Sequence, residues 1–274
     1  MNLRSLRNLF KKHQIRPSKR LGQNFLIDKK AIKKIIEGAK LSPNDTVLEI
    51  GPGIGNLTTE LAPKVKKVIA IEKDQKMIKI LKEVLKDFPQ VEIIKEDVLK
   101  FNPKIYGLKP NTYKIVANIP YYLTSPLIRK FLETENQPKE MVLMVQKEVA
   151  QRISAKPPKM SLLAISIQFY AKAEILSYLS KKSFWPSPEV DSAIIKITPK
   201  RLIQSQELKN RFFKIVKAGF SQPRKQLINN LSKGLKIDRT MIKNWLFKNN
   251  IQPTQRAETL STEDWLKLVK SYKI

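Results

Sequence analysis

Short apolar runs alternate with stretches of helical spacing over the first 200 residues of the chain. Five of these runs have the length of a buried strand and are followed by glycine or polar residues: Thr46–Ile50, Val68–Ile71, Val91–Ile94, Tyr113–Ala117 and Met141–Val145. Two later runs also predict strands, at Ala173–Leu179 and Ala193–Thr198. Apolar positions three and four residues apart predict helices over 28–40, 77–85 and 127–132.

Strands that alternate with helices are typical of a mostly parallel sheet with helices on both faces. We therefore predict an α/β fold with a seven-stranded sheet. Ligands of such sheets bind outside the carboxyl ends of the strands. Polar residues follow four of the predicted strands in succession, at Glu49, Glu72, Asp97 and Asn118. This succession predicts a ligand site at that edge of the sheet.

The pattern changes after Pro199, where strand signals stop. Four segments read as helices: Leu208–Phe220, Lys225–Leu231, Met241–Phe247 and Thr262–Val269. We predict two domains, an α/β domain over residues 1–200 and a small, basic, all-helical domain over 201–274.

Charge narrows the class of partner. The chain has 53 Lys and Arg against 24 Asp and Glu, a net charge of +29, and the excess is densest in residues 1–40 and 201–274. So strong a positive charge repels itself and favours a polyanionic partner, RNA or DNA, bound largely through its phosphates. A lysine-rich proteome is the plain alternative. An anionic membrane or a transit peptide is suggested only by the basic, amphipathic start around Leu3–Phe10.

Cysteine is absent and histidine occurs once, as His13. This composition excludes disulfides, thiolate metal sites and cysteine nucleophiles, and leaves almost no room for imidazole chemistry. We expect no metal site. No apolar run approaches the roughly 18 residues of a membrane span, so we expect no membrane association and a cytoplasmic location.

A glycine-rich turn, Gly51-Pro-Gly-Ile-Gly55, follows the strand Thr46–Ile50 and precedes a helix. Such turns let a backbone approach a nucleotide-like cofactor closely. The dinucleotide pattern would place its third glycine at position 56, which is Asn here, so S-adenosylmethionine is favoured over NAD. Glu72 lies near the spacing expected of a ribose-binding carboxylate, and Asp97 is suited to accept from an adenine amine. A structural turn, a solvated Glu72 and an Asp97 helix cap are the alternatives.

The tetrapeptide Asn118-Ile-Pro-Tyr121 indicates chemistry on an amine. An adenine amine is a weak nucleophile because its lone pair is delocalised into the ring. Two acceptors on its N–H bonds, the Asn118 side-chain oxygen and the Ile119 carbonyl, would favour a nucleophilic geometry. Tyr121 offers a ring on which the base stacks. A turn made rigid by Pro120 is the alternative.

The sequence resembles the small-subunit type of ribosomal RNA adenine N6,N6-dimethyltransferases from about Arg16 to the C-terminus. The segments that carry the resemblance are jointly specific: Lys19–Leu26, Glu49–Thr58, Glu72–Asp74, Glu96–Asp97, Asn118–Tyr122, Gln146–Ala150 and Phe184–Ser192. The resemblance implies a Rossmann-like class I methyltransferase that uses S-adenosylmethionine. Its cofactor-binding residues would be Gln23, Asn24, Leu26, Glu49, Gly51, Gly53, Glu72, Asp97, Val98 and Asn118, the first three from a basic N-terminal segment, 1–27.

The same resemblance implies a catalytic set of Asn118, Ile119, Tyr121 and Phe184, with Phe184 stacking on the target base opposite Tyr121. Phe184 has a core role as its alternative, and Pro186-Ser-Pro188 predicts an extended loop there rather than a strand. Gln23 and Asn24 could instead cap the helix that begins after Asp28. Tyr122 departs from the family, where Asn is frequent, and we expect it not to touch the chemistry.

The implied substrate is two adjacent adenosines in the 3'-terminal hairpin of small-subunit rRNA, each dimethylated within pre-30S particles by a monomeric enzyme. Two basic groups would hold rRNA phosphates: Lys11, Lys12, Arg16, Lys19, Arg20, Arg224 and Lys225. A solvated charged face is the alternative for any one of them. Rival functions are a large-subunit rRNA methyltransferase of the antibiotic-resistance type, a DNA adenine methyltransferase, and a mainly non-catalytic ribosome assembly factor.

Overall fold

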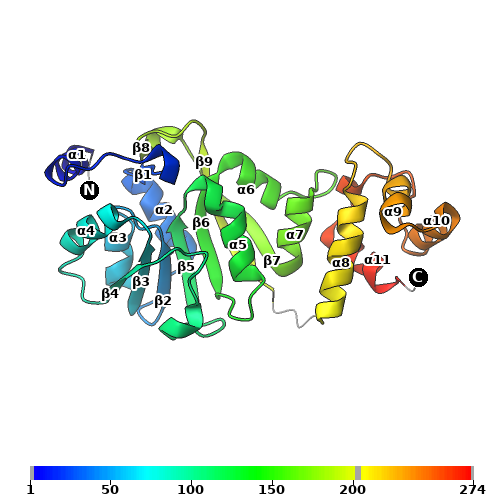
Figure 1. Ribbon diagram of the computed structural model, residues 1–274, viewed down its shortest axis with the longest axis horizontal. Helices are drawn as coiled ribbons and strands as arrows, with labels where there is room; N and C mark the ends of the chain where they lie inside the picture. The colour runs from blue at the N-terminus through cyan, green and yellow to red at the C-terminus, as the bar shows by residue number, and fades with distance from the viewer. Residues whose placement is uncertain (1–2, 201–204, 273–274) are drawn as a thin grey trace. The chain divides into compact units, whose positions relative to one another are not determined.

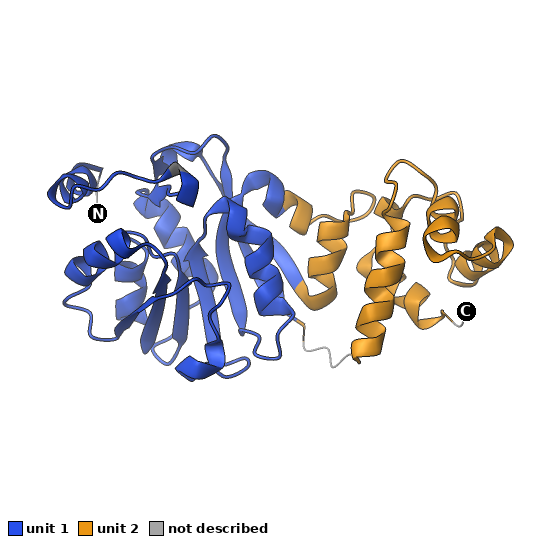
Figure 2. Cartoon of the chain, in the orientation of Figure 1, with its two compact units in different colours: residues 1–150, 172–199 blue, residues 151–171, 200–274 orange. Residues whose placement is uncertain are grey.

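A computed structural model describes residues 3–200 and 205–272 (Figure 1). The described chain divides into two compact units (Figure 2). The first combines the residues up to 150 with 172–199, and the second combines 151–171 with the residues from 200 onward.

A seven-stranded sheet forms the centre of the first unit, in the order β4-β3-β2-β5-β6-β9-β7. Its strands are β2 (Thr46–Ile50), β3 (Lys67–Glu72), β4 (Val91–Lys95), β5 (Tyr113–Asn118), β6 (Glu140–Gln146), β7 (Ala171–Leu179) and β9 (Ser192–Pro199). Neighbours from β4 to β6 are parallel, whereas β6 and β9 are antiparallel. The seven predicted strands and the mostly parallel sheet are thus confirmed.

Strand order reverses beside β2, because β3 lies on one side of it and β5 on the other. Such a reversal opens a crevice at the carboxyl ends of the two strands on either side. Glu49 lies near the end of β2, Glu72 ends β3 and Asn118 ends β5. The topology therefore brings side chains from three separate parts of the chain to one edge.

Helices and short 3₁₀ turns cover the sheet, with α2 behind it and α5 in front of it in Figure 1. In the first unit they are α1 (Leu3–Lys12), η1 (Lys19–Leu21), α2 (Lys29–Ala39), α3 (Thr58–Leu61), η2 (Ala62–Lys64), α4 (Gln75–Val84), η3 (Pro103–Tyr106), η4 (Tyr121–Leu123), α5 (Thr124–Leu132) and η5 (Lys181–Ser183). The Asp28 carboxylate caps α2 by accepting from the backbone N–H groups of Lys30 and Ala31.

The N-terminal segment packs on the first unit through its apolar face. Helix α1 buries Leu6 and Phe10, and the Phe10 ring lies edge-on to Phe25 and Trp185. Next to it, β1 (Phe25–Leu26) and β8 (Phe184–Trp185) pair as an antiparallel two-stranded sheet. The loop predicted from Pro186-Ser-Pro188 contains no strand or helix. Phe184 and Trp185, just before it, form β8 because β1 supplies a hydrogen-bonding partner from a distant part of the chain.

The second unit is helical and has its own core. Its helices are α7 (Leu162–Tyr170), α8 (Gln206–Gly219), α9 (Leu227–Leu235), α10 (Arg239–Lys248), η6 (Ala257–Thr259) and α11 (Thr262–Lys270); α6 (Lys147–Ile153) leads into the unit. The predicted boundary at 200 needs a correction, because residues 151–171 belong to this unit. Helix α7 packs its Phe169 ring against Phe212 of α8, with the ring centroids 4.2 Å apart.

Candidate active site

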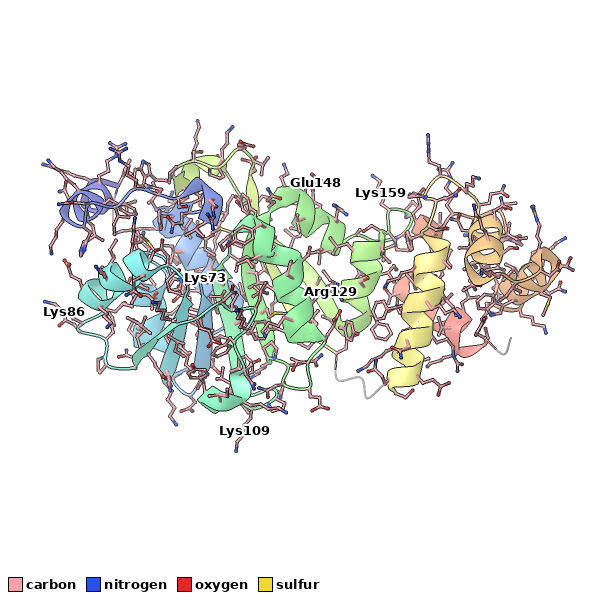
Figure 3. The ribbon with its side chains drawn as sticks, viewed as in Figure 1. Lys73, Lys86, Lys109, Arg129, Glu148 and Lys159 are labelled. Carbon is pink, nitrogen blue, oxygen red and sulfur yellow. The ribbon has the colours of Figure 1, made fainter. Side chains whose placement is uncertain are left out.

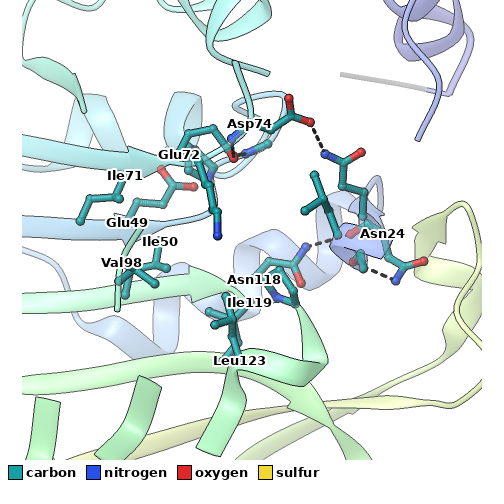
Figure 4. Close-up of a pocket in the computed structure, with 18 of the residues that line it drawn as sticks. Asn24, Glu49, Ile50, Ile71, Glu72, Asp74, Val98, Asn118, Ile119 and Leu123 are labelled. Carbon is teal, nitrogen blue, oxygen red and sulfur yellow. Dashed lines mark hydrogen bonds between the residues drawn. The ribbon is translucent and has the colours of Figure 1, made fainter. Parts of the chain in front are cut away.

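One cavity of about 260 Å³ lies at the carboxyl ends of β2, β3, β4 and β5 (Figure 4). The N-terminal segment and Phe184 complete its wall. Every predicted cofactor and catalytic residue lines it: Gln23, Asn24, Leu26, Glu49, Gly51, Gly53, Glu72, Asp97, Val98, Asn118, Ile119, Tyr121 and Phe184. The fold thus assembles residues that are up to 161 positions apart in sequence. Their individual roles stay predictions.

The glycine turn has a backbone that other residues rarely adopt. Gly51 and Gly53 have φ values of +65° and +59°. A Cβ at Gly53 would lie 3.1 Å from the Phe25 ring, whereas one at Gly51 would meet nothing nearer than Pro120 at 3.8 Å. Gly53 therefore lets the N-terminal segment close on the turn, and Gly51 leaves open space at the cavity.

Glu72 is fixed by backbone donors on both sides. Its carboxylate accepts from Gly53 N at 3.2 Å and from Asp74 N at 2.8 Å. Burial raises the pKa of Glu72 above its ordinary value, although these donors partly oppose the shift. The alternative of a solvated Glu72 is contradicted, because the side chain is nearly buried and tied to the glycine turn.

Glu49 is a buried carboxyl group without full compensation. It is 1% exposed, and burial raises its pKa to about 8, more than the neighbouring Thr58 hydroxyl lowers it. Its Oε2 has no hydrogen-bond partner among the described residues. A buried acceptor of this kind is costly unless a ligand supplies a donor or a positive charge.

Asp97 engages both of its carboxylate oxygens. Oδ2 pairs with Lys73 Nζ at 2.7 Å, and Oδ1 accepts from the backbone N–H of Leu99 at 3.0 Å. The Lys73 ammonium is the main cause that lowers the pKa of Asp97. The capping alternative is thus met in part, because Asp97 closes a turn as well as lining the cavity.

Asn118 is oriented by the N-terminal segment. Its Nδ2 donates to the Asn24 carbonyl at 3.1 Å (Figure 4). Gln23 donates to Asp74 at 2.8 Å, so it reaches the N-terminal cap of α4. The alternative in which Gln23 and Asn24 cap α2 is contradicted, because Asp28 fills that position.

Tyr121 and Phe184, the two aromatic side chains predicted to stack on the base, are positioned by a hydrogen bond and by packing, respectively. The Tyr121 hydroxyl hydrogen-bonds the Ser192 hydroxyl at 2.8 Å, and burial raises the pKa of Tyr121. Phe184 is 4% exposed and packs in a cluster with Leu26 and Leu57. Phe184 therefore belongs to the core and to the cavity wall at once, which joins the two alternatives.

Sequence reasoning missed three side chains that support the cavity. Lys73 and Ser192 make the contacts given above, and Asn56 donates from Nδ2 to the Leu26 carbonyl at 2.8 Å. Asn56 and Ser192 each lie inside a segment that carries the family resemblance, and this position could have marked them as functional. Their partners, however, lie 30 and 71 residues away in sequence, respectively. No pattern in the chain indicates such pairings.

The residues predicted to bind RNA are exposed where they are described. Lys11, Arg16 and Arg20 are exposed in the N-terminal segment, and Arg224 and Lys225 in the turn between α8 and α9. Lys12 pairs with Glu83 at 2.6 Å, which reduces its free charge. The side chain of Lys19 lies outside the described part of the structure.

The described residues form neither a metal site nor a membrane span. They contain no group of three or more His, Asp or Glu side chains placed to hold a metal ion. Over the same residues, no helix has the length and apolar character needed to cross a membrane.

Comparisons with known proteins point to one family. A profile described as "Ribosomal RNA adenine dimethylase" matches residues 13–273. A "Ribosomal RNA small subunit methyltransferase A" of Dehalococcoides mccartyi (strain CBDB1) is 44% identical over 95% of this chain and 90% of its own. The protein of that name from Clostridium botulinum (strain Okra / Type B1) is 41% identical over 98% and 97%.

Solved structures agree at the level of the fold. A "23S rRNA methyltransferase ErmE" superposes with a TM-score of 0.76 at 28% identity, over 90% of this chain and 99% of that one. A dimethyladenosine transferase from Plasmodium falciparum gives 0.75 at 31% identity, over 89% and 95%. These matches confirm the Rossmann-like methyltransferase fold class.

Proposed function

The chain belongs to the ribosomal RNA adenine dimethylase family, and on that basis we propose that it dimethylates adenosine N6 in small-subunit (16S-type) rRNA. The substrate would be two adjacent adenosines of the 3'-terminal hairpin in pre-30S particles. S-adenosylmethionine would be the methyl donor. One observation carries the proposal: relatives that are 40–45% identical over nearly the whole chain bear the small-subunit name.

The chemistry of the cavity fits S-adenosylmethionine, which supplies a methyl group on a positively charged sulfur when bound. Glu72 offers acceptors for ribose hydroxyls, and Asp97 offers one for the adenine amine, beside the apolar Val98. Gly51 leaves room for the methionine portion, because no side-chain atom fills the space there. The unpartnered Oε2 of buried Glu49 suits a cationic group.

Asn118 and Ile119 would activate the target amine. Because Asn118 Nδ2 is committed to the Asn24 carbonyl, Oδ1 is the atom left to accept an N–H from the amine. The backbone carbonyl of Ile119, held by the following Pro120, would be the second acceptor. Two such bonds draw the amine out of conjugation with the ring, which raises the nucleophilicity of its nitrogen.

Tyr121 and Phe184 would hold the adenine ring while Asn118 acts on it. Stacking on an aromatic ring contributes about 1–3 kcal/mol per base, which offsets part of the few kcal/mol needed to extrude a base. The hydrogen bond to the Ser192 hydroxyl restrains the position of the hydroxyl end of the Tyr121 side chain. No histidine is among the described residues that line the cavity, and we propose that the methylated amine loses its proton to water.

The basic segments would bind rRNA through its phosphates, without reading the base sequence. We propose that Lys11, Lys12, Arg16, Lys19 and Arg20 contact rRNA phosphates near the cavity, and that Arg224 and Lys225 do so in the helical unit. We further propose that the enzyme acts as a monomer. Phosphate contacts of this kind position a protein on RNA and weaken strongly with added salt.

The test is tritium transfer from S-adenosylmethionine to unmethylated 30S particles, to 50S particles and to adenine-containing DNA, followed by nucleoside analysis. Dimethyladenosine in 30S rRNA alone is the expected result. Label in 50S rRNA would instead identify large-subunit rRNA as the substrate. The 50S particles are included because the chain is 28% identical to the 23S rRNA methyltransferase. Label in no acceptor, with tight binding to 30S particles retained, would favour a non-catalytic assembly factor.

A further inference from the structure

The mouth of the cavity is made by three exposed side chains. Among the described residues that line the cavity, only Lys73, Leu99 and Tyr122 are exposed to solvent, and we call these three the rim. Lys73 follows β3, Leu99 lies beyond β4, and Tyr122 lies in η4 directly after β5. The rim residues thus come from the carboxyl ends of β3, β4 and β5, with β2 between β3 and β5, whereas the other lining residues are buried or half-buried.

Tyr122 is the aromatic member of the rim, and its side chain lies near Gly22 while staying largely exposed. It is 57% exposed, yet a Cβ at Gly22 would lie 3.7 Å from two atoms of its ring. Successive residues of a 3₁₀ turn point about 120° apart, so Tyr122 does not follow Tyr121 toward Ser192. The Tyr122 ring thus lies near Gly22 and keeps aromatic surface open to solvent beside the opening.

The charge around Tyr122 suits a polyanion. Lys73 shares the rim with it, and Arg20 is exposed one residue before the first lining residue, Leu21. The Lys73 ammonium is paired with Asp97, but that pair lies at the surface, where solvent keeps it open to a further anion. Figure 3 shows Lys73 among the many charged side chains of the first unit. Exposed aromatic rings combined with cationic side chains are the groups that bind single-stranded nucleic acid.

We propose that Tyr122 is a second base platform, which stacks on the nucleotide next to the target adenosine while that adenosine occupies the cavity. Extruding one base removes the stacking partner of its neighbour, and the Tyr122 ring replaces that partner at the mouth. This inference rests on the proposed function. With two adjacent adenosines as substrate, the platform holds one of them while the other is in the cavity.

The experiment measures KM for unmethylated 30S particles with wild-type enzyme and with Tyr122→Ala and Tyr122→Phe. Tyr122→Ala should raise KM about fivefold to a hundredfold, as expected for loss of one stacked base. Tyr122→Phe should stay near wild type, because the ring is kept. Tyr178→Ala is the matched control, since Tyr178 is 50% exposed on β7 and is not among the described lining residues.

A second readout measures stacking directly. In a hairpin RNA with 2-aminopurine next to the target adenosine, wild-type enzyme and Tyr122→Phe should quench the fluorescence, and Tyr122→Ala should not. An unchanged KM and unchanged quenching in Tyr122→Ala would overturn the proposal. So would equal losses in the Phe and Ala variants, or an equal rise in the Kd of S-adenosylmethionine, which would place Tyr122 in the cofactor site.

Failure of the proposed function looks different. Wild-type enzyme would then transfer no label to 30S particles. Quenching by wild type that is lost in Tyr122→Ala would still support the platform as a nucleotide site, and absence of quenching by wild type would overturn it.

Discussion

Asn118 uses the two ends of one amide group for different tasks. Its Nδ2 is bound to the Asn24 carbonyl, and its Oδ1 is left for a donor in the cavity. The amide cannot turn over without losing that bond. The direction of the proposed catalytic acceptor is therefore set by the N-terminal segment and not by β5 alone.

Replacing Asn118 by Ala should reduce methyl transfer far more than cofactor binding. Loss of one pre-oriented hydrogen-bonding group in an active site reduces kcat by about 10²–10³-fold. Tritium transfer measures kcat, and calorimetry measures the Kd of S-adenosylmethionine. Equal loss of both would contradict the role given to Asn118. Asn118→Asp is the informative companion, because it keeps an acceptor and removes the donor to Asn24.

Glu49 should make the affinity for S-adenosylmethionine depend on pH. Its pKa of about 8 means that the free protein holds a proton on Glu49 at pH 7. A cationic ligand group favours the ionised form, so binding should release about one proton, and affinity should rise up to about tenfold per pH unit below pH 8. Calorimetry between pH 6 and pH 9 measures the Kd, and Glu49→Gln should give a flat profile. A flat profile in wild type would refute the prediction.

The raised pKa of Glu49 gives folding stability the opposite dependence on pH. The folded chain keeps the Glu49 proton between about pH 4.5 and pH 8, whereas the unfolded chain releases it. The contribution of Glu49 to the free energy of unfolding is therefore present below about pH 4.5 and is lost as pH rises toward 8. A rise in pH toward 8 should thus strengthen cofactor binding and lower the free energy of unfolding of the ligand-free protein.

At the scale of elements, the N-terminal segment completes a cavity that the sheet alone leaves open. It is tied down by Asn56, which donates to the Leu26 carbonyl, and by the pairing of β1 with β8. Asn56 stands one residue after the last glycine of the turn. A buried side-chain amide therefore connects the glycine turn to the segment that closes over it.

Asn56→Ala should loosen the N-terminal segment and weaken cofactor binding together with catalysis. The change leaves the buried Leu26 carbonyl without its donor, a cost of about 1–3 kcal/mol. Hydrogen exchange over residues 22–27 should become faster. Asn136→Ala is the matched control, because buried Asn136 also donates to a backbone carbonyl, that of Leu108, but does not line the cavity. Similar effects of both variants on the Kd of S-adenosylmethionine would contradict this account.

The limits of sequence reasoning also appear at this scale. The seven sheet strands were predictable because each contains a short group of apolar residues of strand length. Helix α7 was missed because its sequence, Leu162–Tyr170, is apolar on most sides and shows little helical periodicity. Strands β1 and β8 have two residues each and exist only as a pair. The cavity residues were predictable from their motifs, but the contacts of Lys73, Asn56 and Ser192 depend on the fold.

For the whole molecule, charge is the dominant property. Exposed lysines such as Lys86 and Lys109 occur far from the predicted RNA-binding groups in sequence (Figure 3). A general lysine excess is therefore present beside the proposed RNA-binding groups, and the net charge of +29 does not separate the two. Salt dependence separates them, because only cations that neutralise phosphates on binding release counterions.

Affinity for 30S particles should fall steeply between 50 and 200 mM salt. Each phosphate contact contributes about 0.7–0.9 to the slope of log affinity against log salt concentration. Arg224→Gln and Lys225→Gln should each lower that slope by about one contact, while Lys109→Gln should leave it unchanged. Filter binding over a salt series measures the slopes. Equal slopes for all three variants would assign the charge at 224 and 225 to general surface composition.

The helical unit is not one continuous stretch of chain. After β6 the chain leaves the sheet, and residues 151–171 build α7, which packs against α8. The chain then returns to the sheet as β7 and β9. A single cut therefore cannot separate the units: a fragment ending at 200 carries α7 with Phe169 stripped of Phe212. During synthesis, α7 must likewise wait for the last quarter of the chain before its apolar face is covered. Separating the units in an experiment therefore requires removal of both parts of the helical unit, residues 151–171 and the residues from 200 onward, with β6 rejoined to β7.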